Sequence, residues 1–145
     1  MIQSGQPAKR FRVLVVDDDE ATRRSVEGVL GADVDVVTSP SASHALKVLG
    51  EPSGRFHVVC SDYTMPGMNG VELLRKVAAL DPLTSLLLFT GNDEYFRAER
   101  NADFYVIAKP FDPVRLIAIV LQLARICDLK RSSKPTRTGS MPGSR

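Results

Sequence analysis

The chain has 145 residues, of which 43% are hydrophobic and 25% are charged, and its formal net charge at pH 7 is +2. These values are typical of one globular domain that buries a core without disulfide or metal staples. No run approaches the roughly 20 apolar residues of a membrane span, and the start lacks the apolar core of a signal peptide, so we exclude both and expect the cytoplasm.

Five apolar runs of strand length recur along the chain, and the segments between them have the helical spacing of apolar residues. We predict strands over 11–16, 34–37, 56–60, 85–89 and 104–108. Strands that alternate with helices pair in parallel, with the helices crossing over the sheet. The sequence therefore predicts an α/β fold with a five-stranded parallel sheet.

Capping residues mark where the helices begin. Ser39 is predicted to cap the helix after the second strand, with Pro40 at its first position. The pair Asn69 and Glu72 predicts a capping box at the start of the next helix. The segment 92–102 has a poor apolar stripe and predicts only a short helix.

The last helix begins at Asp112-Pro113 and is apolar on more than one face, which indicates a contact surface beyond the one that covers the sheet. We expect a flexible N-terminus over 1–10, a domain over 11–127, and a basic disordered tail or linker over 128–145. The tail carries no aromatic residue to stack on bases, so we do not expect direct contact with nucleic acid. Both cysteines read as buried hydrophobes.

Polar side chains follow four of the predicted strands. Asp17 and Asp18 come after the first strand, and Asp62 comes after the third. Thr90 follows the fourth strand and Lys109 the fifth. Ligands of open parallel sheets bind outside the carboxyl ends of the strands, so we expect these side chains to converge on one edge.

Three carboxylates at one edge would repel one another unless a cation lies between them. An oxygen-only set such as Asp17, Asp18 and Asp62 suits Mg²⁺, and the backbone carbonyl of Thr64 is a plausible further ligand. Lys109 can neutralise an anion beside Asp62. We therefore interpret the edge as a site for Mg²⁺ and a phosphate group.

A carboxylate beside Mg²⁺, with a lysine and a threonine aimed at the same point, can attack phosphorus and form an aspartyl phosphate. In this hypothesis Asp62 is the nucleophile, and the Thr90 hydroxyl moves to bond the new phosphoryl group. Each feature alone has an ordinary interpretation as a turn or a helix cap, which is the role that we assign to Asp19. The combination on one edge favours the phosphoacceptor.

The motifs that carry this chemistry resemble the receiver domains of bacterial two-component response regulators. The resemblance lies in "VLVVDDDEATRRSV", "VVCSDYTMPGMNGVELL", "LLLFTGN" and "VIAKPF", and it covers 11–127. It implies a flavodoxin-like, doubly wound fold of the chemotaxis phosphoacceptor type, with five helices of which the fourth is short. The Asp-x-x-Met-Pro-x-Met-x-Gly loop together with Lys-Pro-Phe makes the combination specific.

By position, the resemblance implies that Asp62 is the phosphoacceptor and that Lys109 binds phosphate. Asp17 and Asp18 would hold Mg²⁺ together with the Thr64 carbonyl. Thr90 would supply the switch hydroxyl. It also implies that Thr64 and Asn92 tune the phosphoryl lifetime. The phosphoryl donor would be a sensor histidine kinase or a histidine phosphotransfer protein. An output domain or effector protein would read the state, and the last helix is a candidate homodimer surface. Such a protein is no enzyme beyond its own phosphorylation and dephosphorylation.

The sequence departs from that family in two places and leaves two alternatives open. The segment between Thr90 and Lys109 is shorter than usual, and Val106 stands where an aromatic switch residue is common, with Tyr105 one position earlier. One alternative is a receiver-like interaction module that works without phosphorylation. The other is a phosphatase of the haloacid-dehalogenase type, whose Asp-x-Asp would be Asp17 and Asp19.

Overall fold

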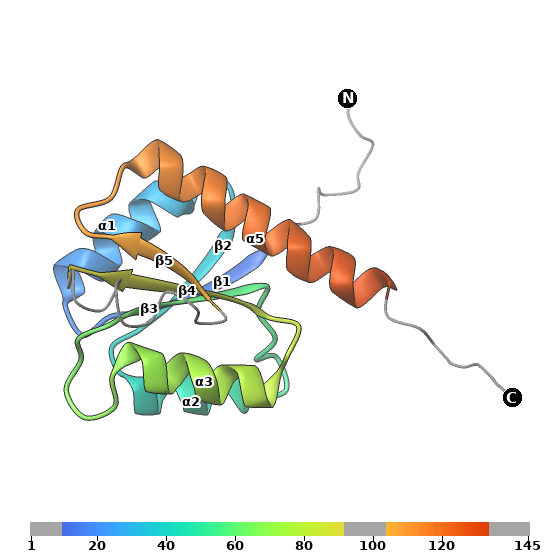
Figure 1. The fold of residues 1–145 in the computed structure, drawn as a ribbon, viewed down its shortest axis with the longest axis horizontal. Helices are drawn as coiled ribbons and strands as arrows, with labels where there is room; N and C mark the ends of the chain where they lie inside the picture. The colour runs from blue at the N-terminus through green and yellow to red at the C-terminus, as the bar shows by residue number, and fades with distance from the viewer. Residues whose placement is uncertain (1–9, 92–103, 134–145) are drawn as a thin grey trace, which may run out of the picture.

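The protein folds as a five-stranded parallel sheet with helices on both faces (Figure 1). The computed structural model describes residues 10–91 and 104–133. Its elements are β1 (Arg12–Val16), α1 (Glu20–Leu30), β2 (Asp35–Ser39), α2 (Ala42–Leu49), β3 (Val58–Asp62), α3 (Gly70–Leu80), β4 (Ser85–Thr90), β5 (Tyr105–Ala108) and α5 (Pro113–Ser133). The order β2-β1-β3-β4-β5 confirms the predicted flavodoxin-like α/β fold. The short fourth helix that was predicted over 92–102 lies outside the described residues.

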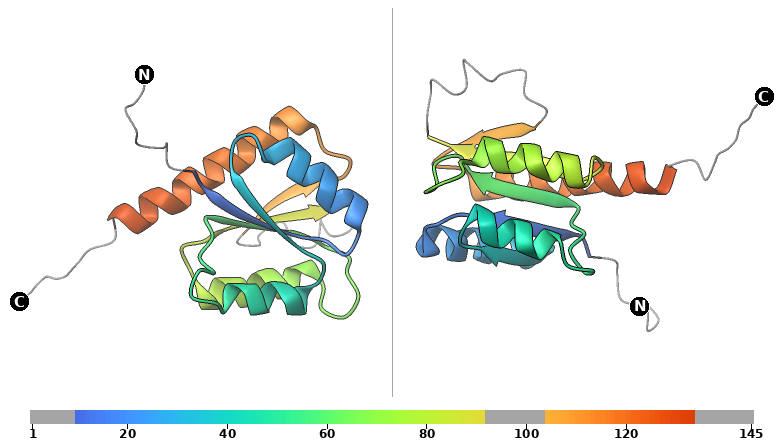
Figure 2. Two further views of the ribbon diagram at one scale, coloured as in Figure 1. Left: turned by 180° about the vertical axis from the view of Figure 1, so that it is seen from behind. Right: turned by 90° about the horizontal axis from the view of Figure 1, so that it is seen from below.

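The sheet separates two hydrophobic clusters, one under α2 and α3 and one under α1 and α5 (Figure 2). Successive strand residues point to opposite faces, so Leu14 and Val59 join the first cluster while Val13 and Val58 join the second. All four side chains are fully buried. Burial on both faces explains why the strands read as continuous apolar runs. The two cysteines are also buried and free, as predicted.

The cap of the second helix lies two residues later than predicted. Ser39 is the last residue of β2, and its carbonyl accepts a hydrogen bond from the Asp17 amide at 3.1 Å. The prediction that Ser39 caps the helix is therefore wrong, because the sheet already uses this residue. The cap is Ser41, whose hydroxyl oxygen accepts from the His44 amide at 3.1 Å. Pro40 lies between strand and cap rather than inside the helix.

The central strand is also shifted by two residues, since β3 runs from Val58 to Asp62 rather than over 56–60. Phe56 is buried, but it lies before the strand, with the Arg12 guanidinium 4.4 Å from the centre of its ring. At the other end the β3–β4 pairing continues to Asp62 and Phe89, and the Tyr63 amide donates to the Phe89 carbonyl at 2.8 Å. Asp62 is thus held by the sheet itself.

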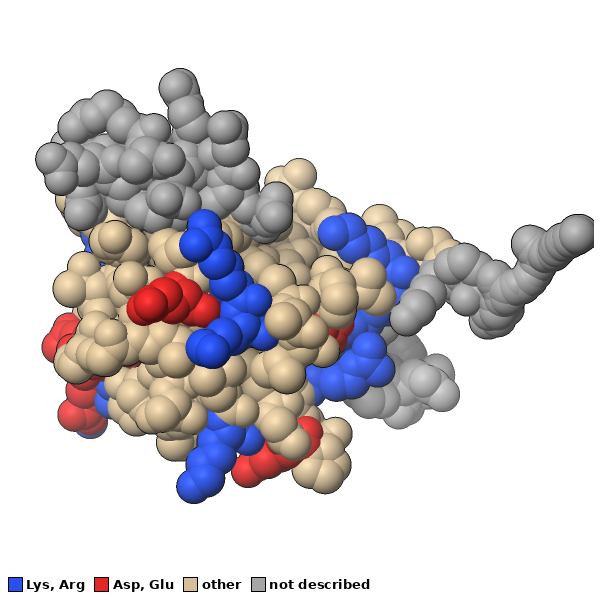
Figure 3. Space-filling view, turned by 60° about the horizontal axis from the view of Figure 1, so that its bottom comes forward, with Lys and Arg blue, Asp and Glu red and all other residues tan. Residues whose placement is uncertain are grey.

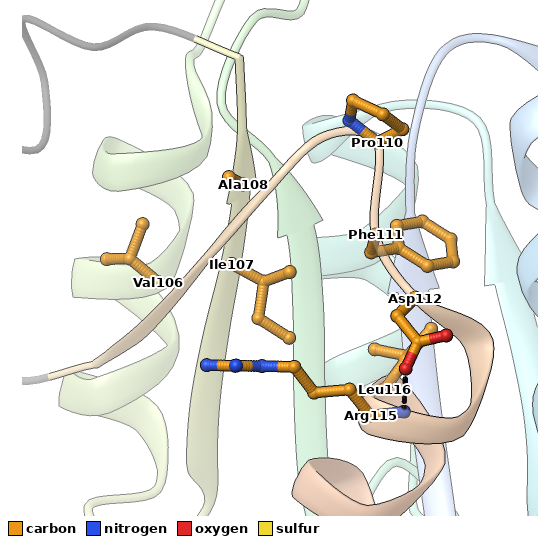
Figure 4. Close-up of a pocket in the computed structure, with 8 residues that line it drawn as sticks. All are labelled: Val106, Ile107, Ala108, Pro110, Phe111, Asp112, Arg115 and Leu116. Carbon is orange, nitrogen blue, oxygen red and sulfur yellow. Dashed lines mark hydrogen bonds between the residues drawn. The ribbon is translucent and has the colours of Figure 1, made fainter.

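The predicted capping box is confirmed. The Asn69 side chain accepts from the Glu72 amide, and the Glu72 carboxylate accepts from the Asn69 amide, both at 2.9 Å. Asp112 likewise accepts from the Arg115 amide at 3.2 Å at the start of α5, as expected for its Asp-Pro beginning (Figure 4).

Regular structure and side-chain contacts extend past both predicted domain boundaries. The helix α5 continues six residues beyond 127, to Ser133, and Arg131 contacts Asp81 at the end of α3. At the other end, Arg10 donates to the carbonyl of Gly31, the C-cap of α1, at 2.9 Å and to the carbonyl of Val34, before β2, at 2.8 Å. Residues 1–9 and 134–145 lie outside the described part of the chain.

The surface carries charges of both signs, and basic and acidic side chains are interspersed on the face that Figure 3 shows. Among the described helices, none combines the length and the apolar character that crossing a membrane requires.

Candidate functional site

The carboxyl ends of four strands bring the predicted site residues to one edge of the sheet. Asp62 is the last residue of β3 and Thr90 the last residue of β4. Asp17 directly follows β1, and Lys109 directly follows β5. In an open parallel sheet this is the edge where ligands bind.

The acidic cluster consists of Asp17, Asp18 and Asp62, which can offer carboxylate oxygens that all lie within 4.8 Å of one another. Asp17 is 2% exposed, whereas Asp18 is exposed. Burial raises the pKa of Asp17 above its ordinary value, although the Asp19 amide donates to its carboxylate at 2.9 Å and Lys109 lies nearby. Three carboxylates at this spacing, with no nitrogen or sulfur ligand among them, fit a hard divalent cation.

The Lys109 ammonium partly neutralises the cluster. Its Nζ lies 2.9 Å from an oxygen of Asp62 and 3.4 Å from an oxygen of Asp17. Burial alone would lower the pKa of Lys109, but the hydrogen bond to Asp62 and the charges of both carboxylates raise it above its ordinary value. The ammonium is therefore protonated at neutral pH and can stabilise negative charge on a group bound beside Asp62.

Backbone contacts fix the ends of β4 and β5 relative to each other. The Lys109 amide donates to the Thr90 carbonyl at 3.0 Å, and the peptide bond from Lys109 to Pro110 is cis. The rings of Phe89 and Phe111 lie 5.4 Å apart beneath these loops. Thr90, the last residue of β4, is itself 1% exposed.

The conformation of the loop after Asp62 explains why the sequence places Met65, Gly67 and Gly70 there. Gly67 has a φ of 79°, a conformation that favours glycine, and Met65 is buried beneath the loop. At Gly70 a Cβ atom would lie 2.2 Å from the carbonyl oxygen of Asp62, so α3 begins in direct contact with the strand end. The Thr64 side chain is exposed, and its carbonyl remains a predicted ligand.

Asp19 has the structural role that was expected of it. Its carboxylate accepts from the Thr22 amide at 3.1 Å and from the Thr22 hydroxyl at 2.6 Å, so it caps α1. The bonds from Thr22 also lower the pKa of Asp19. Because Asp19 is used by the helix and lies outside the acidic cluster, the Asp17 and Asp19 pair of the phosphatase alternative does not form a site.

Tyr105 and Val106, the two residues considered for the switch position, lie in a regular part of β5. The pairs Leu87 with Tyr105 and Leu88 with Val106 belong to a regular parallel ladder, so no bulge shifts the facing of β5 within the described strand. Val106 packs against the cluster under α2 and α3, on the side opposite to Ile107 (Figure 4). Tyr105 is 40% exposed. Asn92, the predicted lifetime residue, lies outside the described residues.

One contact at the site was not predicted. Arg23 on α1 donates to the carbonyl of Asp17 at 2.8 Å and so ties the helix to the strand end. Nothing in the sequence distinguishes Arg23 from its neighbour Arg24, which instead forms an exposed ion pair with Glu20 one helical turn away.

The fold and the site define a doubly wound α/β domain with an acidic triad, Asp17, Asp18 and Asp62, at the carboxyl ends of its strands. Comparison with known families shows that the chain belongs to the response regulator receiver domain family, which matches residues 13–121. A receiver domain is a signalling module rather than an enzyme with turnover, so the phosphatase interpretation of this domain is wrong.

Relatives with known names are mostly longer than this chain. It is 36% identical over 123 residues to the C4-dicarboxylate transport transcriptional regulatory protein DctD of Rhizobium meliloti, which covers 82% of this chain and 25% of DctD. It is 34% identical over 113 residues to the transcriptional regulatory protein FixJ of Azorhizobium caulinodans, covering 74% of this chain and 52% of FixJ. The chain thus spans a quarter to about half of these two regulators.

Solved receiver structures agree with the fold. A CheY-like receiver domain protein from Methanospirillum hungatei has a TM-score of 0.74 at 28% identity, covering 84% of this chain and 99% of that one. The BeF₃-activated DrrB receiver domain has a TM-score of 0.69 at 30% identity and covers 81% of this chain and 99% of its own.

Proposed function

We propose that Asp62 accepts a phosphoryl group from a phosphohistidine and that this modification controls which partners the domain binds. The observation that carries the proposal is the contact of Asp62 with Lys109 at 2.9 Å, next to Asp17 and Asp18. A carboxylate at the end of a buried strand, paired with an ammonium at the edge where ligands bind, is placed to act as a nucleophile.

In the proposed reaction an oxygen of Asp62 forms a bond to phosphorus while the bond from phosphorus to the donor's imidazole nitrogen breaks. The electron pair of that bond stays on the imidazole. Lys109 stabilises the charge of the transferring group, and the Thr90 hydroxyl donates to it afterwards. Mg²⁺, held by Asp17, Asp18 and Asp62 with the Thr64 carbonyl, would supply further charge stabilisation on the phosphoryl oxygens.

The partner that donates the group is, in this proposal, a sensor histidine kinase or a histidine phosphotransfer protein in the cytoplasm. A groove of about 580 Å³ lies between α1 and the loop that follows β5, and its lining includes Ala21, Ser25, Lys109 and Pro110. The small side chains of α1 leave room for a donor helix directly beside the Lys109 ammonium. The reader of the signal is an output domain or an effector protein.

The last helix is our proposed surface for a homodimer. Val114, Ile126 and Leu129 on α5 are 73%, 37% and 67% exposed. Sedimentation of the chain with and without beryllofluoride should show association that Leu129→Lys removes. A chain that stays monomeric at the highest concentrations in both states would contradict the dimer.

The phosphoacceptor is tested by incubation with acetyl phosphate and Mg²⁺. Intact mass should increase by one phosphoryl group, which hydroxylamine removes, and Asp62→Asn should abolish the increase. Asp19→Asn is the matched control, because asparagine also caps helices and Asp19 lies outside the cluster, so this variant should be phosphorylated like the wild type. The absence of any adduct with acetyl phosphate and with phosphorylated donor proteins would refute the proposal.

A second candidate is an interaction module that keeps the fold and works unphosphorylated. The observation that favours it is Val106, since the usual aromatic switch is absent from the described part of β5. A Mg²⁺ titration separates the two candidates. Binding at millimolar Mg²⁺ supports the phosphoacceptor, and no binding at these concentrations supports the module.

A further inference from the structure

The end of α5 lies away from Asp62, at the end of the sheet where the strands β3 and β4 begin. Cys127 is the last fully buried residue of this helix, and Leu129 is 67% exposed. The helix nevertheless continues to Ser133 and projects beyond the body of the domain (Figure 1). Apolar packing therefore does not explain residues 128–133, which we call the exit arm.

Arg131 binds the exit arm to the rest of the domain. Its Nη2 donates to the carbonyl of Phe56 and to a carboxylate oxygen of Asp81, both at 2.9 Å, and it lies 3.3 Å from the hydroxyl oxygen of Thr84. The Thr84 hydroxyl donates to the same Phe56 carbonyl at 3.0 Å. One guanidinium thus joins α5 to Phe56, two residues before β3, and to Asp81, the cap that ends α3.

A backbone amide holds the Asp81 carboxylate in place for this contact. Asp81 is the C-cap of α3, and its carboxylate also accepts from the Leu83 amide at 3.1 Å. Burial would raise the pKa of Asp81, but the bond from Leu83 and the charge of Arg131 lower it below its ordinary value. The carboxylate is therefore fixed and charged where Arg131 meets it.

Two further polar contacts join the C-terminal half of α5 to the starts of β3 and β4. The Ser85 hydroxyl at the start of β4 donates to the Leu123 carbonyl of α5 at 2.7 Å. His57, which precedes β3, has its Nε2 4.0 Å from a carboxylate oxygen of Asp128. Polar groups from the starts of β3 and β4 thus meet the last three turns of α5, where burial decreases.

We propose that Arg131 is a positioning residue that makes the exit arm a rigid continuation of the domain. The direction in which the chain leaves the domain at residue 133 is then fixed relative to the end of the sheet opposite Asp62. Two helical turns without such a contact are marginal in water and fray. The inference does not depend on phosphorylation of Asp62, so either can fail without the other.

Hydrogen exchange of the full chain tests the contact. Arg131→Gln and Asp81→Asn should speed the exchange of the amides of 129–133 by about tenfold or more, while the amides of β1 and β3 keep their protection. Arg125→Gln, an exposed arginine on the same helix, is the matched control and should leave the arm unchanged. Equal exchange of the arm in the wild type and in both contact variants would overturn the proposal.

The rigidity of the arm is measured with a fluorophore attached to the cysteine of the Ser133→Cys variant. The two native cysteines are buried, and burial raises the pKa of the Cys60 thiol to about 12 and that of the Cys127 thiol above its ordinary value, so labelling is selective. Time-resolved anisotropy should show a label that rotates with the domain. Adding Arg131→Gln should introduce a fast component of large amplitude, and Arg131→Lys should restore part of the rigidity. A fast component of equal amplitude with and without Arg131 overturns the proposal.

Discussion

At the scale of single residues, the site is a balance between three carboxylates and one ammonium. Lys109 touches Asp62 and the buried Asp17, and Asp18 adds a third negative charge within 4.8 Å. A charge that loses its partner inside a protein costs more than the pair contributed, because it is left without compensation. Two predictions follow at this scale. One concerns the charge of Lys109 and the other the space around Gly70.

Replacing Lys109 by Gln should lower the free energy of unfolding in EDTA by about 1–3 kcal/mol, because Asp17 and Asp62 then face each other uncompensated. Millimolar Mg²⁺ should restore most of that loss, since the cation takes over the neutralisation. Urea unfolding of both proteins with EDTA and with Mg²⁺ measures this. Equal losses in the two conditions would show that Lys109 and the cation do not share the same carboxylates.

Gly70→Ala should destabilise the domain by about 1–3 kcal/mol, because the new methyl would meet the Asp62 carbonyl oxygen and a methyl group of Leu88 at 2.2 and 2.8 Å. It should also slow phosphorylation by acetyl phosphate, since relief of the contact moves the end of β3. Gly28→Ala is the control, because a Cβ there has no neighbour within 4 Å, and it should stabilise α1 by about 0.5–1 kcal/mol. A harmless Gly70→Ala would mean that α3 can withdraw from the strand at little cost.

At the scale of elements, the sequence predicts more about which elements exist than about where they end. The alternation of apolar runs and the caps at Asn69 and Asp112 gave the strands and helices correctly, because these signals are local. Ser39 and Ser41 are equally good caps by composition, and only the pairing of β2 with β1 decides between them. The convergence of Asp17, Asp62 and Lys109 could be predicted because parallel strands share an edge.

The contact of α3 with α5 could not be predicted, because Arg131 and Asp81 are 50 residues apart and each looks like an ordinary surface charge. Its pH dependence is testable. Since the folded-state pKa of Asp81 is lowered, the contact adds stability above the unfolded-state pKa of about 3.9, and this stability is lost as the pH falls through the lower folded value.

Asp81→Asn should therefore cost a nearly constant amount of stability from pH 8 to about pH 5, and the cost should shrink below about pH 4. The pair is about a quarter exposed, so a loss of about 1 kcal/mol is expected at neutral pH. Urea unfolding of the wild type and the variant across this range gives the difference directly. A cost that grows toward low pH would contradict the assigned sign.

At the scale of the whole molecule, the domain places its acidic site at one end of the sheet and the exit arm at the other (Figure 1). The site stores unfavourable repulsion that a cation can relieve, so metal binding and folding are linked. A ligand that binds only the folded state adds stability that grows with its concentration, about 2.7 kcal/mol at one hundred times the dissociation constant.

Mg²⁺ should consequently raise the melting temperature of the wild type in proportion to the logarithm of its concentration above the dissociation constant. Asp18→Asn should abolish this rise without lowering stability in EDTA, because Asp18 is exposed and its charge only repels its neighbours when no cation is present. NaCl at matched ionic strength controls for screening, which acts on every exposed charge alike. Thermal unfolding followed by circular dichroism gives the melting temperatures of both proteins in EDTA, in Mg²⁺ and in NaCl. A variant that still responds to Mg²⁺ like the wild type would place the cation away from Asp18.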